Sequence, residues 1–414
     1  MATAKPHGPR TEPASTRVQH FFSPCPRGLE QVLREELDRL GAVDLDPVEG
    51  GVGYAGEFHL CYHINLHSRI ASRVLWRLAQ APYRDETDVY RTVNALPWRS
   101  YFAPERTIRV NVSATSSPLR SLDFITLRIK DAVCDRFRSQ TGQRPSVDTA
   151  NPDVRIHAFL DASTLSVYLD TSGDPLFKRG LRAQAGEAPL RENLAAGILR
   201  LAGWEPGTAL LDPMCGAGTL LMEAAEMSLA RAPGSRRGFA FEKLDNFDAT
   251  RWSQIRAQAQ ADEQPARALP IYGSDLYGNA LSTARENLAH AGLEAAVQIK
   301  QANALEVSAP APTGVLVANP PYGVRLGEQQ GLADLYPKLG DALKQRFAGW
   351  RACIFTADLR LPKLIGLKPA RRIVLYNGAL ECRLYVFELV AGAMRKPSRG
   401  DDHGAGRVDA GKAG

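Results

Sequence analysis

The sequence has few cysteines and no long apolar run, and these absences exclude several classes of protein. Its 414 residues contain six cysteines, which are scattered and never form a Cys-x-x-Cys pair. This spacing argues against a disulfide framework and a zinc site, and it fits a reducing compartment. No apolar run reaches the roughly 18 residues of a membrane span, and the N-terminus lacks the apolar core of a signal peptide. We therefore expect a cytoplasmic protein with no metal and no membrane partner.

Two common nucleotide-binding motifs are also missing. The glycine-rich loop at residues 212–219 has neither the Gly-x-Gly-x-x-Gly spacing of a dinucleotide site nor the Gly-Lys-Ser/Thr ending of a phosphate-binding loop. Dinucleotides and nucleoside triphosphates are therefore disfavoured as ligands. The loop is also acidic, which suits a ligand with an amino group better than a phosphate.

The chain is long enough for two or three domains, because one domain usually takes roughly 100–200 residues. Its net charge of +6 makes it mildly basic, which is consistent with a polyanionic partner. Hydrophobic periodicity makes the first part a mixture of helices and strands. Predicted strands lie at 20–22, 52–58, 107–113, 155–160 and 165–170, and predicted helices at 29–40, 61–78 and 122–138.

The third of these helices is basic. It carries Arg128, Lys130, Arg136 and Arg138. These side chains could contact the phosphates of a nucleic acid, or they could form an ordinary solvated helix face.

After a predicted linker at 171–182, strands and helices alternate. Predicted strands lie at 208–211, 271–275, 297–301, 315–318 and 352–356, and predicted helices at 191–201, 219–230, 279–290 and 332–347. This alternation indicates an α/β fold with a mostly parallel sheet covered on both faces. Two further strands at 372–376 and 382–389 flank Asn377-Gly378 and predict an antiparallel hairpin at one edge. Residues 232–262 form an insertion that we expect to be irregular.

Ligands of such sheets bind at the carboxyl ends of the strands. Gly216 and Gly218 would let the backbone approach a ligand closely. Asp275 could bind both ribose hydroxyls of a nucleoside, or it could simply cap the next helix. Asn303 is placed to meet an adenine amino group. A ligand with an amino acid, a ribose and an adenine fits these strand ends, and S-adenosylmethionine is such a ligand.

A further strand end carries Asn319-Pro320-Pro321-Tyr322. Proline has no N–H and holds the preceding residue in extended geometry, so this corner is rigid. An exocyclic amino group could donate its hydrogens to the Asn319 side-chain oxygen and the Pro320 carbonyl, with Tyr322 stacked on the ring. This arrangement suits methylation of an exocyclic amine, although an ordinary proline turn after a strand has the same pattern.

With these motifs the chain resembles the class I methyltransferases of exocyclic amines, and in particular the RNA guanine-N2 methyltransferases that carry a THUMP domain. The loop at 212–219 and the corner at 319–322 are the most specific matches. Residues 24–30 (Pro-Cys-Pro-Arg-Gly-Leu-Glu) are similar to the opening of the family's ferredoxin-like domain, and residues 66–170 are similar to THUMP. Further matches are Gly180-Leu181-Arg182, residues 189–195 and Phe239-Ala240-Phe241-Glu242.

The resemblance and the composition together predict the domain order. We expect a disordered leader at 1–17, a ferredoxin-like domain at 18–65, a THUMP RNA-binding domain at 66–175, a class I (Rossmann-like) methyltransferase domain at 176–394 and a disordered tail at 395–414. Some members of the family continue into a second methyltransferase unit. Because this chain stops shortly after Leu389, we expect that second activity to be absent.

The resemblance also implies the chemistry. The cofactor would be S-adenosylmethionine, and the substrate a guanine N2 in ribosomal RNA, in 23S rRNA or its large-subunit precursor. The implied base-handling residues are Asn319, Pro320, Pro321 and Tyr322. The implied cofactor-binding residues are Asp212, Pro213, Cys215, Gly216, Gly218, Thr219, Asp275, Asn303 and Ala304. Asn303 stands where an aspartate is common in such enzymes.

Two other interpretations stay open. The same tetrapeptide serves enzymes that methylate DNA adenine or a protein glutamine, and the chain could also be a non-catalytic ribosome assembly factor. The N-terminal module with its basic helix favours RNA, because a glutamine methyltransferase has no need of it.

Overall fold

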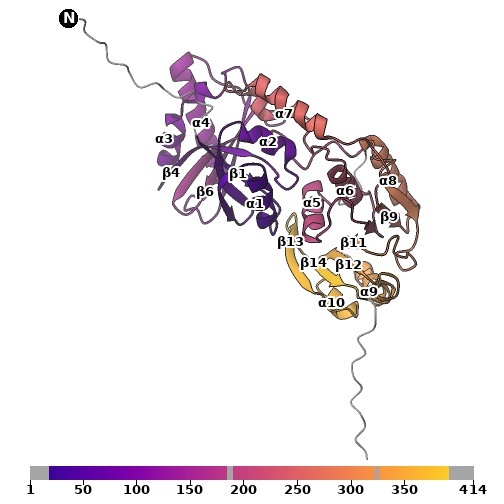
Figure 1. The fold of residues 1–414 in the computed structure, drawn as a ribbon. Coiled ribbons are helices and arrows are strands. Elements are labelled where there is room, and N and C mark those ends of the chain that lie inside the picture. The colour runs from indigo at the N-terminus through magenta and orange to yellow at the C-terminus, as the bar shows by residue number, and fades with distance from the viewer. Residues whose placement is uncertain (1–17, 184–189, 322–325, 391–414) are drawn as a thin grey trace, which may run out of the picture.

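The structure is a computed structural model, and it describes residues 18–183, 190–321 and 326–390. The predicted leader at 1–17 and tail at 395–414 lie outside these residues. Figure 1 shows two α/β units that meet along one side, the N-terminal unit around β1, β4 and β6 and the C-terminal unit around β9, β11 and β12.

One continuous sheet forms the N-terminal unit. In the described part of the chain it has seven strands in the order β2-β3-β1-β4-β7-β6-β5. Its strands are β1 (Gln19–Pro24), β2 (Val43–Val48), β3 (Gly51–Gly56), β4 (Leu75–Pro82), β5 (Ile108–Ala114), β6 (Val154–Leu160) and β7 (Thr164–Asp170). Strand β1 pairs with β4 through Phe21 and Trp76. The two expected N-terminal domains therefore share a sheet.

Four helices cover this sheet among the described residues: α1 (Glu30–Arg39), α2 (Leu60–His67), α3 (Glu86–Ala95) and α4 (Leu122–Thr141). Helix α4 follows the predicted stripe, with Ile125, Ile129 and Phe137 buried. Ser121 caps its start by accepting a hydrogen bond from the Phe124 N–H, and Gly142 ends it in the left-handed region.

The predicted helix at 61–78 is wrong. Helix α2 stops at His67, and Ser68 leaves it in extended geometry. The later part of the predicted helix is strand β4, in which Leu75 pairs with both Phe22 and Asp170. Tertiary pairing on both sides of β4 thus overrides a helical spacing of apolar residues.

A second seven-stranded sheet forms the C-terminal unit of the described chain, in the order β10-β9-β8-β11-β12-β14-β13. Its strands are β8 (Leu210–Asp212), β9 (Ile271–Asp275), β10 (Gln298–Gln301), β11 (Gly314–Ala318), β12 (Trp350–Thr356), β13 (Arg371–Asn377) and β14 (Leu380–Glu388). The first five are parallel and the last two form an antiparallel hairpin. The predicted parallel sheet with an antiparallel edge is confirmed.

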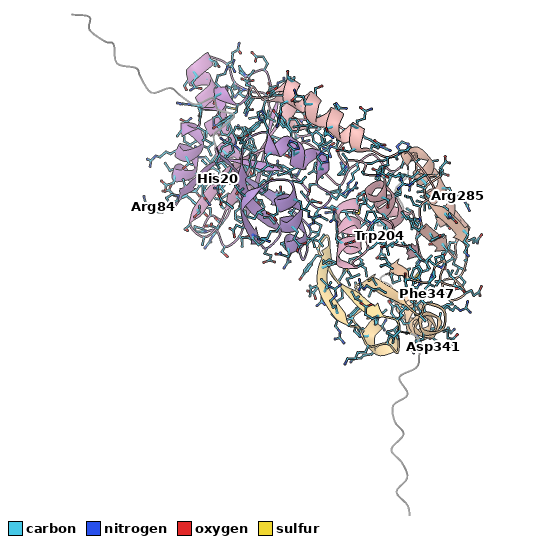
Figure 2. The ribbon with its side chains drawn as sticks, viewed as in Figure 1. His20, Arg84, Trp204, Arg285, Asp341 and Phe347 are labelled. Carbon is cyan, nitrogen blue, oxygen red and sulfur yellow. The ribbon has the colours of Figure 1, made fainter. Side chains whose placement is uncertain are left out.

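Helices lie on both faces of this second sheet. They are α5 (Glu192–Leu201), α6 (Thr219–Ser228), α7 (Ala249–Asp262), α8 (Gly278–Ala291), α9 (Leu326–Arg346) and α10 (Leu361–Leu364). The insertion at 232–262 was expected to be irregular, but α7 occupies its second half because Trp252, Ile255 and Ala259 bury one face. Asp341 of α9 points outward, and Phe347, the residue that follows the end of α9, is buried (Figure 2).

The two units are joined by buried contacts rather than by a loose linker. Tyr62 of α2 stacks on Phe241 at 4.4 Å between ring centroids. The guanidinium of Arg179, in the segment expected to be a linker, pairs with the buried carboxylate of Glu223. Asn193 of α5 donates to the carbonyl of Ile70 at 3.3 Å. The N-terminal unit is therefore held in one position relative to the second sheet.

Candidate active site

The strand order brings the predicted site residues to one edge of the second sheet. Strand β8 lies between β9 and β11, with Asp212 paired to Gly273 and Leu211 paired to Leu316. Because these three strands are parallel, their carboxyl ends meet at the same edge. Asp212, Asp275 and the corner at 319–321 therefore lie on neighbouring strand ends.

The loop after β8 folds back on Asp275. The Gly216 N–H donates to Asp275 Oδ2 at 2.9 Å, and the Gly218 N–H donates to the Cys215 carbonyl at 2.8 Å. Gly216 and Gly218 have φ of +51° and +83°, which a side chain would strain. Both glycines therefore adopt the left-handed geometry that the sequence predicted for them. We call this turn the glycine cradle, and its role in cofactor binding stays a prediction.

The carboxyl group of Asp212 has a raised pKa. Burial raises its pKa to about 8, a hydrogen bond from the Met214 N–H opposes the rise, and the neighbouring Asp275 carboxylate adds to it. A cation at this edge would favour the ionised form of Asp212. Burial also raises the pKa of the Cys215 thiol well above its usual range, so it is poorly suited to act as a nucleophile.

Asp275 and Asn303 lie at the carboxyl-end edge of the sheet, and both side chains accept hydrogen bonds from the backbone of nearby loops. Asp275 accepts hydrogen bonds from the N–H groups of Gly216 and Tyr277, so part of its role is the turn into α8. Asn303 accepts from the Leu305 N–H at 3.0 Å. The Ala302 N–H donates to the Asp275 carbonyl, which links the two strand ends. Each carboxylate oxygen of Asp275 retains capacity for a further donor.

The corner after β11 contains a buried polar side-chain atom with unused hydrogen-bonding capacity. Asn319 Oδ1 is buried and has no hydrogen-bond partner among the residues that the structure describes. A buried acceptor without a donor costs about 1–3 kcal/mol, which makes it a position that a bound ligand can stabilise. Pro320 is buried and Pro321 is exposed. Tyr322 lies outside the described residues.

Two residues that sequence reasoning did not assign to the site hold the glycine loop. Arg182 Nη2 donates to Thr219 Oγ1 at 3.1 Å, and Arg182 Nε lies 3.1 Å from a carboxylate oxygen of Glu192. Asn287 of α8 donates to the Ala217 carbonyl and accepts from the Ala183 N–H. Arg182 belongs to a motif noted in the sequence. Its contact with Thr219 could not be predicted, because the two residues are 37 positions apart in the chain.

The basic residues of α4 are on the N-terminal unit and are largely engaged. The Arg128 guanidinium lies over the Tyr90 ring at 4.6 Å. Lys130 is paired with Asp131 and Arg138 with Asp135. Arg136 Nε is buried without a partner among the described residues. A role for these four side chains in RNA binding stays a prediction.

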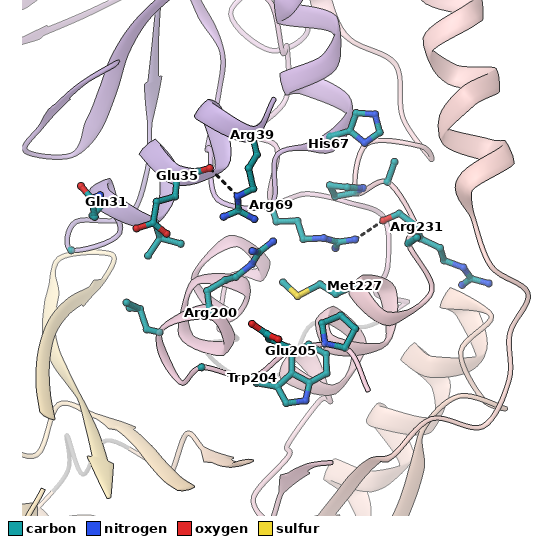
Figure 3. Close-up of a pocket in the computed structure, with 18 of the residues that line it drawn as sticks. Gln31, Glu35, Arg39, His67, Arg69, Arg200, Trp204, Glu205, Met227 and Arg231 are labelled. Carbon is teal, nitrogen blue, oxygen red and sulfur yellow. Dashed lines mark hydrogen bonds between the residues drawn. The ribbon is translucent and has the colours of Figure 1, made fainter. Parts of the chain in front are cut away.

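A large pocket lies elsewhere, at the junction of α1, α5 and α6 (Figure 3). It has a volume of about 790 Å³, and Arg39, Arg200, Trp204 and Glu205 are among its lining residues. Because Trp204 and Glu205 precede β8, the pocket is at the opposite end of the strand from Asp212. It therefore does not coincide with the predicted site.

Neither a metal cluster nor a membrane span is found in the described part of the chain. No group of three or more histidine, cysteine, aspartate or glutamate side chains in the described ranges could hold a metal ion. Within the same ranges, every helix is too short or too polar to cross a bilayer.

Three domain families match the sequence in order. Residues 20–75 match the RlmL ferredoxin-like domain, 83–170 the THUMP domain and 179–386 the RMKL-like methyltransferase domain. The expected succession of domain types and the fold class are confirmed.

Individual relatives agree with these matches. A candidate RNA methyltransferase of Synechocystis sp. is 37% identical over 92% of this chain and 100% of its own length. The ribosomal RNA large subunit methyltransferase K/L of Syntrophotalea carbinolica is 40% identical over 89% of this chain but only 53% of its own length. The chain thus spans about half the length of the K/L relatives. The crystal structure of SMU.472, a candidate methyltransferase in complex with SAH, superposes with a TM-score of 0.83 at 30% identity, covering 91% of this chain and 99% of that one.

Proposed function

Because the chain belongs to the family of methyltransferases that joins an RlmL ferredoxin-like, a THUMP and an RMKL-like catalytic domain, we propose that it methylates the exocyclic N2 amine of a guanine in 23S ribosomal RNA. The methyl donor is S-adenosylmethionine. Such a substrate implies action in the bacterial cytoplasm.

This proposal depends on Asn319 Oδ1, which has no hydrogen-bond partner in the described part of the chain. It is a buried acceptor at a proline-held corner, adjoining the strand end of Asp212. An amino group on a planar base can donate one hydrogen to this oxygen and the other to the Pro320 carbonyl. Both bonds draw the amine out of conjugation with the ring, so its lone pair becomes available to attack. No side chain has to form a covalent bond, because positioning alone can contribute about 7–11 kcal/mol.

The residues at the neighbouring strand ends fit the cofactor. The glycine cradle at Gly216 and Gly218 offers close backbone approach, and Asp275 has acceptor capacity for ribose hydroxyls. The ligand amino group is a cation, and it would stabilise the ionised form of Asp212. When bound, S-adenosylmethionine supplies an electrophilic methyl group on a sulfonium, and the protein aligns the amine with it. The similar SMU.472 protein was crystallised in complex with SAH, which supports the same ligand class here.

The test is transfer of labelled methyl groups from S-adenosylmethionine to three substrates in parallel. We expect label in 23S rRNA and none in duplex DNA or in protein. Label in DNA adenine or protein glutamine would replace the proposal with another substrate class. Absence of both transfer and cofactor binding in a calorimeter would favour a non-catalytic assembly factor.

The same transfer assay is repeated with the variant Asn319→Ala and compared with the wild-type protein. Because it removes the acceptor oxygen but none of the residues at the β8 or β9 ends, turnover should fall by at least about a hundredfold. Affinity for S-adenosylhomocysteine should change less than about threefold, because the residues proposed to bind the cofactor lie on other strand ends and keep their side chains. Wild-type turnover in this variant would show that the reaction does not need the Asn319 side chain, and it would contradict the proposal.

A further inference from the structure

The loop after β12 leaves the sheet beside the Asn319 corner. Strand β12 pairs with β11 in parallel, with Ala318 opposite Ile354. Asn319 and Pro320 therefore run alongside Phe355 and Thr356, and the following residues emerge next to them. Strand β14 lies on the other side of β12, with Arg383 opposite Thr356. Adjacent strands are about 4.8 Å apart, so β12 and β14 are about 5 and 10 Å from β11.

Arg360 lies on this loop, and two hydrogen bonds to Asp358 hold its guanidinium group in place. Arg360 Nε and Nη2 donate to the two carboxylate oxygens of Asp358 at 2.9 and 2.8 Å. The Asp358 N–H in turn donates to Thr356 Oγ1 at 3.0 Å. The Asp358 side chain is 7% exposed, whereas that of Arg360 is 48% exposed. Since a two-bond fork fixes the guanidinium plane, Arg360 presents its charge to solvent in one orientation.

Two more arginines share this side of the sheet. Arg383 is held by its neighbour Glu381 at 2.7 Å, and Arg372 lies on β13 opposite Tyr385. Burial raises the pKa of Tyr385, the charges of Arg383 and Arg372 oppose this rise, and the charge of Asp358 adds to it. All of these groups are therefore within electrostatic reach of Tyr385. We call Arg360, Arg372 and Arg383 the edge arginines.

Charge is unevenly distributed about the corner. The strands on one side of β11 end in Asp212 and Asp275. On the other side of β11, the loop after β12 and the strands β13 and β14 carry the edge arginines, together with the carboxylates of Asp358 and Glu381. Three guanidinium groups against two carboxylates give the second side a net positive charge that attracts a polyanion whose base enters the corner, whereas the strand ends of the first side carry carboxyl groups.

From this asymmetry we infer that the edge arginines bind the phosphates of the RNA strand that flanks the target nucleotide. The inference rests on the proposed function, because it requires RNA at the Asn319 corner. It assigns RNA contact to the catalytic unit, in addition to any contact made by α4. Arginine suits this role because its planar fork matches a phosphate group.

The experiment compares RNA binding by the full-length protein and four variants. The double variant Arg372→Ala/Arg383→Ala removes two of the charges, and Arg372→Lys/Arg383→Lys keeps them. Arg285→Ala is a surface control on α8 (Figure 2). Arg200→Ala tests the junction pocket, where its side chain is directed toward that of Arg39 (Figure 3). The probe is a labelled 23S rRNA transcript, titrated at several salt concentrations.

We expect the alanine double variant to bind the transcript about tenfold more weakly at low salt, with a salt-dependence slope reduced by about two. The lysine double variant and both single controls should keep wild-type slopes. Affinity for S-adenosylhomocysteine should stay unchanged and thermal unfolding should stay cooperative, which separates RNA contact from misfolding.

A double alanine variant with wild-type RNA affinity and slope would overturn the inference. So would a loss of affinity confined to Arg200→Ala, because that would place the RNA at the opposite end of the sheet. Failure of the proposed function has a different signature, namely no methyl transfer to RNA by the wild-type protein, whatever the variants bind.

Discussion

Arg182 offers a sharp test of how the cofactor loop is held. Arg182→Met removes the hydrogen bond to Thr219 Oγ1, the one to the Leu190 carbonyl and the pairing with Glu192. These groups are largely shielded, with the Arg182 and Glu192 side chains 13% and 10% exposed. A charge-assisted hydrogen bond in such surroundings contributes about 1.5–3 kcal/mol. Only the Thr219 bond acts on the loop directly, so we assign that share to cofactor binding.

A loss of about 1.5 kcal/mol corresponds to a roughly tenfold weaker affinity for S-adenosylhomocysteine in a calorimetric titration. The control is Arg236→Met, which removes a guanidinium that donates to the Ala291 carbonyl at 2.6 Å and makes no hydrogen bond to the loop among the described residues. Both variants should lose thermal stability, but only Arg182→Met should lose ligand affinity. Equal affinities in the two variants would refute the idea that Arg182 positions the loop.

Two other predictions concern stability. The folded-state pKa of Asp212, about 8, is above its ordinary value of 3.8. The folded protein therefore binds more protons between these values, and ligand-free stability should fall as pH rises from about 4 to 8. Urea unfolding at pH 5 and pH 8 should show a smaller decrease for Asp212→Asn, and an equal decrease would contradict the raised pKa. Gly28→Ala should destabilise the protein by more than about 2 kcal/mol, because a Cβ there would lie 2.2 Å from the Val374 carbonyl oxygen at a φ of +91°. Gly142→Ala, also at positive φ but with open space around it, should cost only about 1–2 kcal/mol, and equal costs would show that the Gly28 contact relaxes.

Local patterns predicted those elements in which one face alone decides burial. Helix α4 and strand β6 follow their apolar spacing because each buries one regular face. Strand β4 was missed because the spacing of Ile70, Val74 and Leu75 also fits a helix, and only its pairing with β1 and β7 decides the matter. Helix α7 had a usable signal in Trp252, Ile255 and Ala259, which recur at helical spacing within a polar segment.

The candidate site was predictable to the extent that it depends on topology. The carboxyl ends of parallel strands lie at the same edge of a sheet. The parallel sheet alone therefore predicts that this edge carries Asp212, Asp275 and Asn319. What could not be predicted were contacts across the chain, such as that of Arg182 with Thr219. That Asn319 Oδ1 has no hydrogen-bond partner within residues 18–183, 190–321 and 326–390 could not be predicted either, because it depends on where donors from other parts of the chain lie.

The most direct test of the proposed activity is to identify the methylated product. Purified protein is incubated with isotope-labelled S-adenosylmethionine and unmodified 23S rRNA, and the RNA is digested to nucleosides for mass spectrometry. We expect label in N2-methylguanosine. Label in a methylated adenosine, in a guanosine methylated at another atom, or in no nucleoside at all would contradict it.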